Sequence, residues 1–355
     1  MNALKAVVLA SCMVGTMTGC LSQPKQDDNI IYYTHFPDST SIKLKPWFRH
    51  EKAFINHITV ADNRLYVTDL SDQSSELIYC FDAATGAPVT TYFSRTHQQY
   101  GGIKPLSSGI LHDGILWFYD PQLSRMVSFD MASNDASLLP EQIKLKSTYR
   151  QLVLLNDSMA LISGKVRSAT NEELSIITLP DENSLHDFET YPVEDKDMDP
   201  MMRQQAHQGA VHYYEKMHMA VKGKNLLDEF YIIDLTSKKL VKVRGPEHPD
   251  NNGKIKRPNP AADGIMPNMD RRYFIWGGAF TEKYIYLSFT EPPGNGIQEH
   301  SNIVLVFDWA GKPLRRIELS TFVSAIAILE NTNEIVGFNS AEGMFYKASL
   351  NGNDH

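Results

Sequence analysis

One unit recurs along this chain: an apolar run that ends in an acidic residue, then a tight polar turn and usually a second apolar run. The clearest copies are FDAATG at 81–86, FDMASND at 129–135, IIDLTSKK at 232–239 and VFDWAGKP at 306–313. Two weaker copies lie at 174–188 and 343–353. Short apolar runs bounded by Asn, Asp, Gly and Pro are typical of β-strands joined by turns.

A second pair of apolar runs precedes each copy. These pairs lie at 57–69, 109–120, 152–163, 210–221, 274–289 and 325–338. The repeated unit is therefore four antiparallel strands, here named A to D, and no helix is expected after residue 30. Four strands per repeat of roughly 40–50 residues are typical of a β-propeller blade. We predict an all-β fold, a six-bladed β-propeller of four-stranded antiparallel blades.

The last unit lacks a fourth strand because the sequence ends soon after its third. An incomplete blade would leave an open sheet edge and an unclosed ring. The alternating stretch STSIKLKPW at 39–47 precedes the first A strand and is predicted to complete the last blade. Residues 31–355 then form a single propeller domain. Seven blades remain the alternative, if 245–272 contains further strands.

The N-terminus carries targeting information. Lys5 precedes an apolar run at 6–17, which is too short to span a bilayer and is typical of a secretory signal. MTGC at 17–20 resembles the lipobox of bacterial lipoproteins. Residues 1–19 are thus predicted to be a lipoprotein signal peptide, Cys20 the lipidated residue, and 20–30 a flexible tether.

The first blade and the lipobox together suggest a family. FDAATG follows NRLYVTD at 63–69, behind MTGC, whereas YGGIKP at 100–105 departs from the Gly-x-Gly-Pro stretch that relatives carry there. This arrangement resembles the TolB-like six-bladed propeller lipoproteins of Bacteroidetes-type bacteria. The resemblance implies the propeller fold and a cell-envelope location as an outer-membrane lipoprotein, facing the periplasm or the surface. It implies no catalytic site.

Charge and cysteine content narrow the function classes. The formal net charge is -8 and no Lys/Arg-rich run occurs, which argues against nucleic acid as a partner. Cys12 lies in the signal and Cys20 carries the lipid, so Cys80 is the one thiol left for the propeller. No intramolecular disulfide is then possible. Cys80 stands in the apolar run LIYCF, which predicts a buried, inert thiol.

The predicted links differ in length between the two faces of the propeller. The A–B and C–D turns share one face and are mostly short. The B–C and D–A links share the other, here called the loop-rich face, and include the long segments 163–173, 245–272 and 290–302. Elaborated loops on a rigid scaffold usually carry binding residues, so we expect function on the loop-rich face.

The N-terminal ends of the A strands and the links beside them supply the candidate site. The candidate ligand-binding residues are His57, Lys104, Tyr149, Arg150, Arg203, His207, Arg272, Tyr273 and Trp276. The cations among them come from four blades and would form a positive funnel suited to carboxylates of acidic sugars or peptides. Alternatively, these residues pair with nearby acids and have a structural role.

No zinc-protease, nucleotide-binding or nucleophile-elbow motif occurs, and no catalytic residue, metal or cofactor is predicted. Two sets were weighed as metal ligands: His207, His212 and His218, and, for Ca²⁺, Asp69, Asp72 and Glu76. Both are disfavoured. The three histidines are expected to be spread across a blade, and the three acids are expected to lie in an ordinary hairpin loop that binds no metal. The recurring Asp82, Asp130, Asp234 and Asp308 are predicted to cap the C–D turns.

Two hypotheses from different classes follow. The favoured one is a monomeric binding or scaffolding module, held at a membrane through Cys20, that presents its loop-rich face to an acidic glycan, a peptide or an envelope protein. The alternative is a propeller-type enzyme (a lyase, lactonase or glycoside-acting hydrolase) with its site at the channel mouth. An enzyme would need catalytic groups with separated pKa values there.

Overall fold

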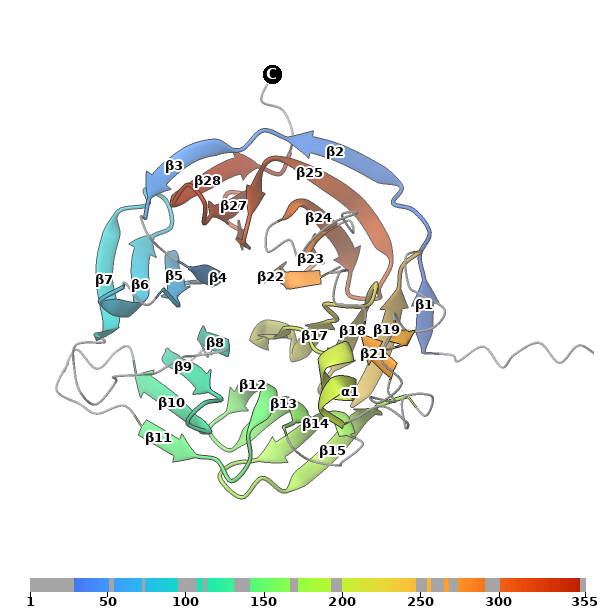
Figure 1. Ribbon diagram of the computed structural model, residues 1–355. Coiled ribbons are helices and arrows are strands. Elements are labelled where there is room, and N and C mark those ends of the chain that lie inside the picture. The colour runs from blue at the N-terminus through green and yellow to red at the C-terminus, as the bar shows by residue number, and fades with distance from the viewer. Residues whose placement is uncertain are drawn as a thin grey trace, which may run out of the picture.

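The computed structural model describes residues 29–50, 54–71, 74–94, 107–110, 114–130, 141–166, 172–192, 200–246, 254–256, 265–267, 274–290 and 301–351. Within them, six sheets surround a central axis (Figure 1). The four strands of each blade are antiparallel and ordered from the axis outward, which confirms the predicted six-bladed β-propeller.

The strands follow the predicted repeat closely. Blade 1 contains β4 (Ile55–Ala61), β5 (Arg64–Asp69), β6 (Glu76–Asp82) and β7 (Pro88–Ser94). Blade 2 contains β8 (Ser107–Ile110), β9 (Ile115–Asp120), β10 (Arg125–Asp130) and β11 (Glu141–Lys144). Blade 3 contains β12 (Tyr149–Asn156), β13 (Met159–Lys165), β14 (Glu172–Thr178) and β15 (Ser184–Thr190).

Blade 4 contains β16 (Val211–Tyr214), β17 (Met219–Gly223), β18 (Glu229–Asp234) and β19 (Lys239–Arg244). Blade 5 contains β22 (Phe274–Phe280), β23 (Tyr284–Phe289), β24 (Ser301–Asp308) and β25 (Pro313–Val323). Blade 6 contains β26 (Ala325–Leu329), β27 (Glu334–Asn339), β28 (Met344–Ser349) and, from the N-terminal part of the chain, β3 (Lys45–Arg49).

The N-terminal segment closes the ring and also covers two further blades. β3 pairs antiparallel with β28, as predicted, although the predicted strand 39–47 corresponds to two strands. The first, β2 (Asp38–Ile42), adds in parallel to β25, and β1 (Ile30–Tyr32) adds in parallel to β19 (Figure 1). Residue 30, assigned to the tether from the sequence, is therefore paired with the propeller.

The long link after blade 4 does not hold a seventh blade within its described residues. It contributes only the two-stranded sheet of β20 (Lys254–Lys256) and β21 (Ile265–Pro267). The expectation of no helix was wrong for two short segments, α1 (Pro200–Ala206) and a 3₁₀ turn at Glu215–Met217. Both lie in links between strands, where no sheet hydrogen bonds compete. None of the described helices has the length and apolar character needed to cross a membrane.

The C–D turns confirm the capping role predicted for the recurring aspartates. Asp82 Oδ1 accepts hydrogen bonds from the amides of residues 84 and 85. Asp234 and Asp308 accept bonds from amides in their own turns in the same way. For Asp130 the following turn lies outside the described residues. An aspartate that bonds to its own backbone favours the turn and needs no ligand to explain it.

The hydrophobic core is divided among the junctions between blades. One cluster joins blades 6 and 1, another joins blades 1 and 2, and the largest extends over blades 2, 3 and 4. Cys80 is 2% exposed within the cluster between blades 1 and 2, as the sequence predicted for an inert thiol. Each blade therefore buries both of its faces against neighbours, which holds the loop-rich face on a rigid ring.

Candidate functional site

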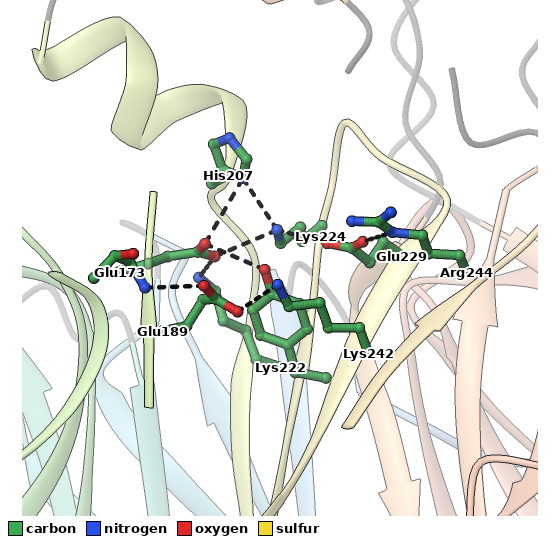
Figure 2. A network of polar contacts seen from close by, with 10 residues as sticks. Glu173, Glu189, His207, Lys222, Lys224, Glu229, Lys242 and Arg244 are labelled. Carbon is green, nitrogen blue, oxygen red and sulfur yellow. Dashed lines mark hydrogen bonds and ion pairs between the residues drawn. The ribbon is translucent and has the colours of Figure 1, made fainter. Parts of the chain in front are cut away.

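A group of charged side chains lies where blades 3 and 4 meet at the loop-rich face (Figure 2). Its members come from ends of strands at that face and from the link after α1. They are Glu173, His207, Lys222, Lys224, Glu229, Tyr231 and Arg244, here called the ionic cluster. All except the partly buried Arg244 are at most 2% exposed. Buried charges of this kind persist only when they are paired.

Glu173 of blade 3 is the centre of the ionic cluster. Its Oε1 atom accepts a hydrogen bond from Lys222 Nζ at 2.5 Å and lies 3.6 Å from Lys224 Nζ. Its Oε2 atom accepts a hydrogen bond from the Tyr231 hydroxyl at 3.2 Å. Lys222, Lys224 and Tyr231 all belong to blade 4 or the link within it, so one carboxylate ties the two blades together.

Glu229 holds the other side of the ionic cluster. Lys224 Nζ lies 2.7 Å from Glu229 Oε1, and Arg244 Nε donates to Glu229 Oε2. Beside it, the Tyr33 hydroxyl, from the segment after β1, donates to buried Asp228 Oδ1 at 2.9 Å. The covering N-terminal segment therefore contacts the loop between β17 and β18, which carries Lys224 and Asp228.

The surroundings fix the charge states of the ionic cluster. Burial opposes ionisation of Glu173, but the ammonium groups of Lys222 and Lys224 outweigh it and lower its pKa to about 2. Burial also raises the pKa of Glu229, but the charges of Lys224 and Arg244 outweigh this effect and lower it. Burial, reinforced by Lys224, lowers the pKa of His207 to about 3, so this imidazole is neutral at pH 7.

Close backbone contact places His207 in the ionic cluster. The amide of Gly223 donates to the carbonyl of Ala210 at 3.1 Å, and the amide of Asn225 donates to the carbonyl of Gln208 at 2.9 Å. A Cβ atom on Gly209 would lie 1.7 Å from the Gly223 carbonyl oxygen, so only glycine permits this approach. His207 Nδ1 consequently lies 3.0 Å from Lys224 Nζ (Figure 2).

Two predicted arginines converge beside the ionic cluster, around Tyr191. The Arg203 guanidinium carbon, from α1, lies 5.0 Å from the Tyr191 ring centroid. Arg150, at the start of β12, lies on the same side: its Cγ atom and the Tyr191 hydroxyl both border Gly164, each 3.1 Å from where a Cβ would stand, and the Arg150 charge acts on this phenol as that of Arg203 does. The buried Nε of Arg150 has no hydrogen-bond partner among the described residues.

The structure thus brings together three of the predicted site residues, Arg150, Arg203 and His207. It separates two others. Tyr149 is buried and donates its hydroxyl hydrogen bond to Glu182 at 2.8 Å. His57 lies in the central channel, where its ring stacks on that of His212 from the opposite blade, 5.5 Å between centroids, and burial lowers its pKa to about 4.

The remaining predicted site residues are not described. Lys104, Arg272 and Tyr273 lie outside the described residues, and so does the side chain of Trp276, whose backbone belongs to β22. These four stay predictions.

The two sets weighed as metal ligands are not assembled in the described part of the chain. His207 belongs to the ionic cluster, His212 stacks on His57, and His218 contacts the Tyr213 hydroxyl at 3.1 Å. Asp69 Oδ1 accepts backbone amide bonds from Phe54 and Ser71. Asp72 lies outside the described residues. Among those described, no three His, Cys, Asp or Glu side chains gather as metal ligands do.

Most residues of the ionic cluster were not predicted from the sequence as site residues. Glu173 and Glu229 both stand at the beginning of a C strand, in consecutive repeats, and Lys222 and Lys224 bracket the end of the B strand between them. An alignment of the repeats by strand position shows opposite charges at the same end of neighbouring blades. That signal was available, but their pairing depends on the packing of one blade against the next.

Comparison with known proteins agrees with the fold. A family model described as TolB-like 6-blade propeller-like matches residues 34–331. A Bacteroides fragilis protein whose description names it as exported is 9% identical, with a TM-score of 0.56 over 90% of this chain and 98% of that one. A member of the DUF4221 family from Bacteroides vulgatus is 9% identical, with a TM-score of 0.51 over 86% and 97%. No curated protein matches.

Proposed function

We propose that this chain, which belongs to the TolB-like 6-blade propeller-like family, is a binding module of the cell envelope that presents its loop-rich face to an anionic ligand. The observation that carries the proposal is the convergence of Arg150 and Arg203 on Tyr191, beside α1. The ligand classes are those expected from the sequence: an acidic glycan, a peptide carboxylate or an acidic surface of an envelope protein.

The charge balance beside Tyr191 supports an anionic ligand. Together with Arg150 and Arg203, the ionic cluster holds five cations against two carboxylates, Glu173 and Glu229. Among the described residues, the bordering Glu172 and Asp228 do not reverse this excess, and the ion pair of Lys242 with Glu189 leaves it unchanged. Arginine binds carboxylates in a bidentate geometry, and partial burial strengthens each such bond. The half-buried Arg150, whose Nε atom has no hydrogen-bond partner in the described part of the chain, is the residue best placed to contact the ligand.

The position of α1 supports the same assignment. Arg203 and Gln204 of α1 are buried, and Gln204 Nε2 donates to the Lys165 carbonyl of blade 3 at 2.5 Å. α1 also lies against β21 from the link after blade 4. Two insertions on the loop-rich face are therefore packed together over a rigid base, as a preorganised binding surface requires.

A thermal-shift titration tests the proposal. The chain from Leu21 onward, which contains every described strand, is titrated with an oligogalacturonate, an acidic peptide and a neutral oligosaccharide of matched length. We expect stabilisation by an acidic probe only, with affinity reduced roughly tenfold to a hundredfold in Arg150→Ala, because a charge-assisted hydrogen bond is lost.

Arg64→Ala is the matched control, because Arg64 pairs with Asp82 at the opposite face. This variant should bind as the parent chain does. Absence of a shift with both acidic probes, or an equal loss in Arg64→Ala, would contradict the proposal.

Anchoring through Cys20 belongs to the same proposal. Lipidation of a cysteine that follows a signal peptide would hold the propeller at a membrane, as an outer-membrane lipoprotein does. The description of the Bacteroides fragilis protein as exported is compatible with this location. Cys20→Ser should release the chain from the membrane fraction and abolish incorporation of labelled fatty acid. Persistence of the label in this variant would contradict lipidation at Cys20.

The enzyme hypothesis receives less support from the ionic cluster. A glycoside-acting hydrolase that used these carboxylates would need one of them protonated at neutral pH as its general acid. Glu173 and Glu229 both have lowered pKa values, so both are ionised at pH 7. Turnover of the oligogalacturonate by the parent chain, lost in Glu173→Gln, would favour the enzyme instead.

A further inference from the structure

Lys224 makes several directed contacts inside the ionic cluster. Its Nζ atom lies 2.7 Å from Glu229 Oε1, 3.0 Å from His207 Nδ1 and 3.6 Å from Glu173 Oε1. The same atom lies 4.4 Å from the centroid of the Tyr231 ring. An ammonium group has three N–H donors and no acceptor. Lys224, which is 1% exposed, therefore directs its donors to fixed partners and not to solvent.

This geometry determines where the proton of His207 lies. Burial lowers the pKa of Lys224, but the carboxylates of Glu173 and Glu229 outweigh it and raise that pKa, so Lys224 is an ammonium at pH 7. Because an ammonium only donates, His207 Nδ1 must accept. His207 Nδ1 also lies 3.8 Å from Glu173 Oε2, too far for a hydrogen bond from an Nδ1–H group. His207 is therefore a neutral imidazole with its proton on Nε2.

His207 connects this hydrogen bond to α1. Its amide donates to the Arg203 carbonyl at 3.2 Å, which continues the last turn of the helix. Its ring centroid lies 5.5 Å from that of Tyr191, the ring that the Arg203 guanidinium covers. Lys224 belongs to the link between β17 and β18 of blade 4, whereas Tyr191 follows β15 of blade 3. One hydrogen bond thus joins the end of α1 to the centre of the ionic cluster (Figure 2).

Lys222 resembles Lys224 in burial and charge but has a different partner. It is fully buried, donates to Glu173 Oε1 at 2.5 Å and lies 5.7 Å from the Tyr231 ring centroid. In the described part of the chain its hydrogen bond goes to Glu173 and not to His207. The two lysines therefore differ in whether they hold the histidine.

We propose that Lys224 is a positioning residue for the candidate ligand site: by donating to Nδ1 of neutral His207, it holds α1, and with it Arg203, in place over Tyr191. The role in binding rests on the proposed function, whereas the tautomer and the restraint on α1 do not need a ligand. A buried ion pair contributes little to stability but constrains geometry. Lys222 supplies a second cation for Glu173 without this restraint.

Nitrogen NMR of the histidine rings in the chain from Leu21 onward tests the tautomer without any variant. The charges that face His207 are those of Lys224, Glu173, Lys222 and Glu229. Burial and Lys224 lower its pKa to about 3, so we expect an unprotonated Nδ1 and a protonated Nε2 at pH 7 and still at pH 5. A proton on Nδ1, or protonation of the ring at about pH 6.5 as in a free histidine, would overturn the proposal.

Lys224→Met and Lys222→Met separate position from charge. Each removes a buried ammonium beside Glu173 and leaves an apolar side chain of similar length, so both lose charge and stability. Only Lys224→Met removes the bond to His207. We expect the pKa of His207 to rise more in Lys224→Met, and hydrogen exchange at the amides of residues 207 and 208 to quicken more. Equal changes in the two variants would show that Lys224 has no positioning role.

Calorimetric titration with the oligogalacturonate measures the effect on binding. Lys224→Met should bind roughly tenfold more weakly than Lys222→Met, because a displaced Arg203 loses a charge-assisted hydrogen bond to the ligand. Equal affinities in the two variants would remove Lys224 from the binding site. If the parent chain binds neither acidic probe, the proposed function fails, while NMR and hydrogen exchange still decide whether Lys224 positions α1.

Two substitutions of His207 replace this comparison if Lys224→Met does not fold. The side-chain oxygen of His207→Asn can take the place of Nδ1 as acceptor for Lys224, whereas His207→Leu offers no acceptor. Slow hydrogen exchange at residue 208 should therefore be retained in His207→Asn and lost in His207→Leu. Equal loss in both would contradict a role for this hydrogen bond.

Discussion

Two junctions of the ring are held by opposite kinds of contact. At the junction of blades 6 and 1, Phe48 and Phe345 of blade 6 stack on each other with 4.4 Å between ring centroids, and they lie 4.8 and 6.1 Å from Phe81 of blade 1. Between blades 3 and 4, Glu173 contacts Lys222 and Lys224. Apolar packing depends on area and shape, whereas an ion pair depends on the presence and protonation of each partner.

The kind of contact at each junction fits what that junction does in the fold. The junction between blades 6 and 1 joins the two ends of the ring, because β3 comes from the N-terminal part of the chain. Non-directional packing suits a contact that must form whenever the ends meet. The ionic cluster instead sets the positions of individual side chains below α1, next to the proposed ligand site. Burial of charge is a poor source of stability but constrains geometry tightly.

Removal of an aromatic ring at the closing junction should have the largest effect. Phe345 is fully buried and contacts Phe48, Phe81 and Phe338. Phe345→Ala is expected to lower the free energy of unfolding by about 3–5 kcal/mol, through lost transfer energy and a cavity. Denaturant unfolding followed by fluorescence measures this change. A loss below about 1 kcal/mol would mean that the junction is not closed by this packing.

Removal of the central carboxylate charge in the ionic cluster should cost about 3 kcal/mol at pH 7. Glu173→Gln leaves Lys222 and Lys224 buried with one counter-charge fewer, and an unpaired buried charge is strongly destabilising. Glu318→Gln is the control: this exposed carboxylate lies 3.7 Å from Arg316 and should contribute less than about 1 kcal/mol. Similar losses in both variants would contradict a special role for the ionic cluster.

The two junctions should respond differently to acid. Because folding lowers the pKa of Glu173 from 4.5 to about 2, its stabilisation is complete above the unfolded value and is lost as pH falls toward 2. The stability difference between the parent chain and Glu173→Gln should therefore shrink between about pH 5 and pH 2. The difference for Phe345→Ala should stay nearly constant, since no ionisable group is removed. Urea unfolding at stepwise pH compares them.

The smallest effect concerns the link between the N-terminal segment and the ionic cluster. Tyr33→Phe removes the hydroxyl that donates to buried Asp228 and should cost about 1–3 kcal/mol. Hydrogen exchange should quicken in the 224–228 loop beside Asp228 and remain unchanged at β7. Equal change at both places would indicate general destabilisation instead of local coupling.

Much of the fold was predictable because propeller strands leave regular patterns. β22 and β23 match the predicted pair 274–289, since alternating apolar residues there have no competing helical period. The capping role of Asp82, Asp234 and Asp308 follows from local chemistry within each turn. α1 was missed because PMMRQQA is a short helix. β1 was missed because Ile30 was assigned to the tether and no strand was predicted at the start of the propeller domain.

The candidate site was only partly predictable. The strand ends pointed to one face, and Arg150, Arg203 and His207 do lie together there, although their binding role stays a prediction. His57 was assigned to the same group because it also begins an A strand. It instead lies in the channel against His212, because A strands of opposite blades meet at the axis. The local sequence shows where a residue lies along its strand, but it does not show how far apart two residues lie around the ring.

The sequence by itself determined the strand repeat, the turns and the face with elaborate links, since each depends on neighbouring residues. It also indicated that an N-terminal strand closes the ring, because the last repeat lacks a fourth strand. Tertiary structure alone decided which charges meet. Lys222 and Glu173 are 49 residues apart and contact each other only because blades 3 and 4 pack side by side. Tertiary structure also decided which outer strands are covered, because that depends on the path of residues 30–49 around the rim.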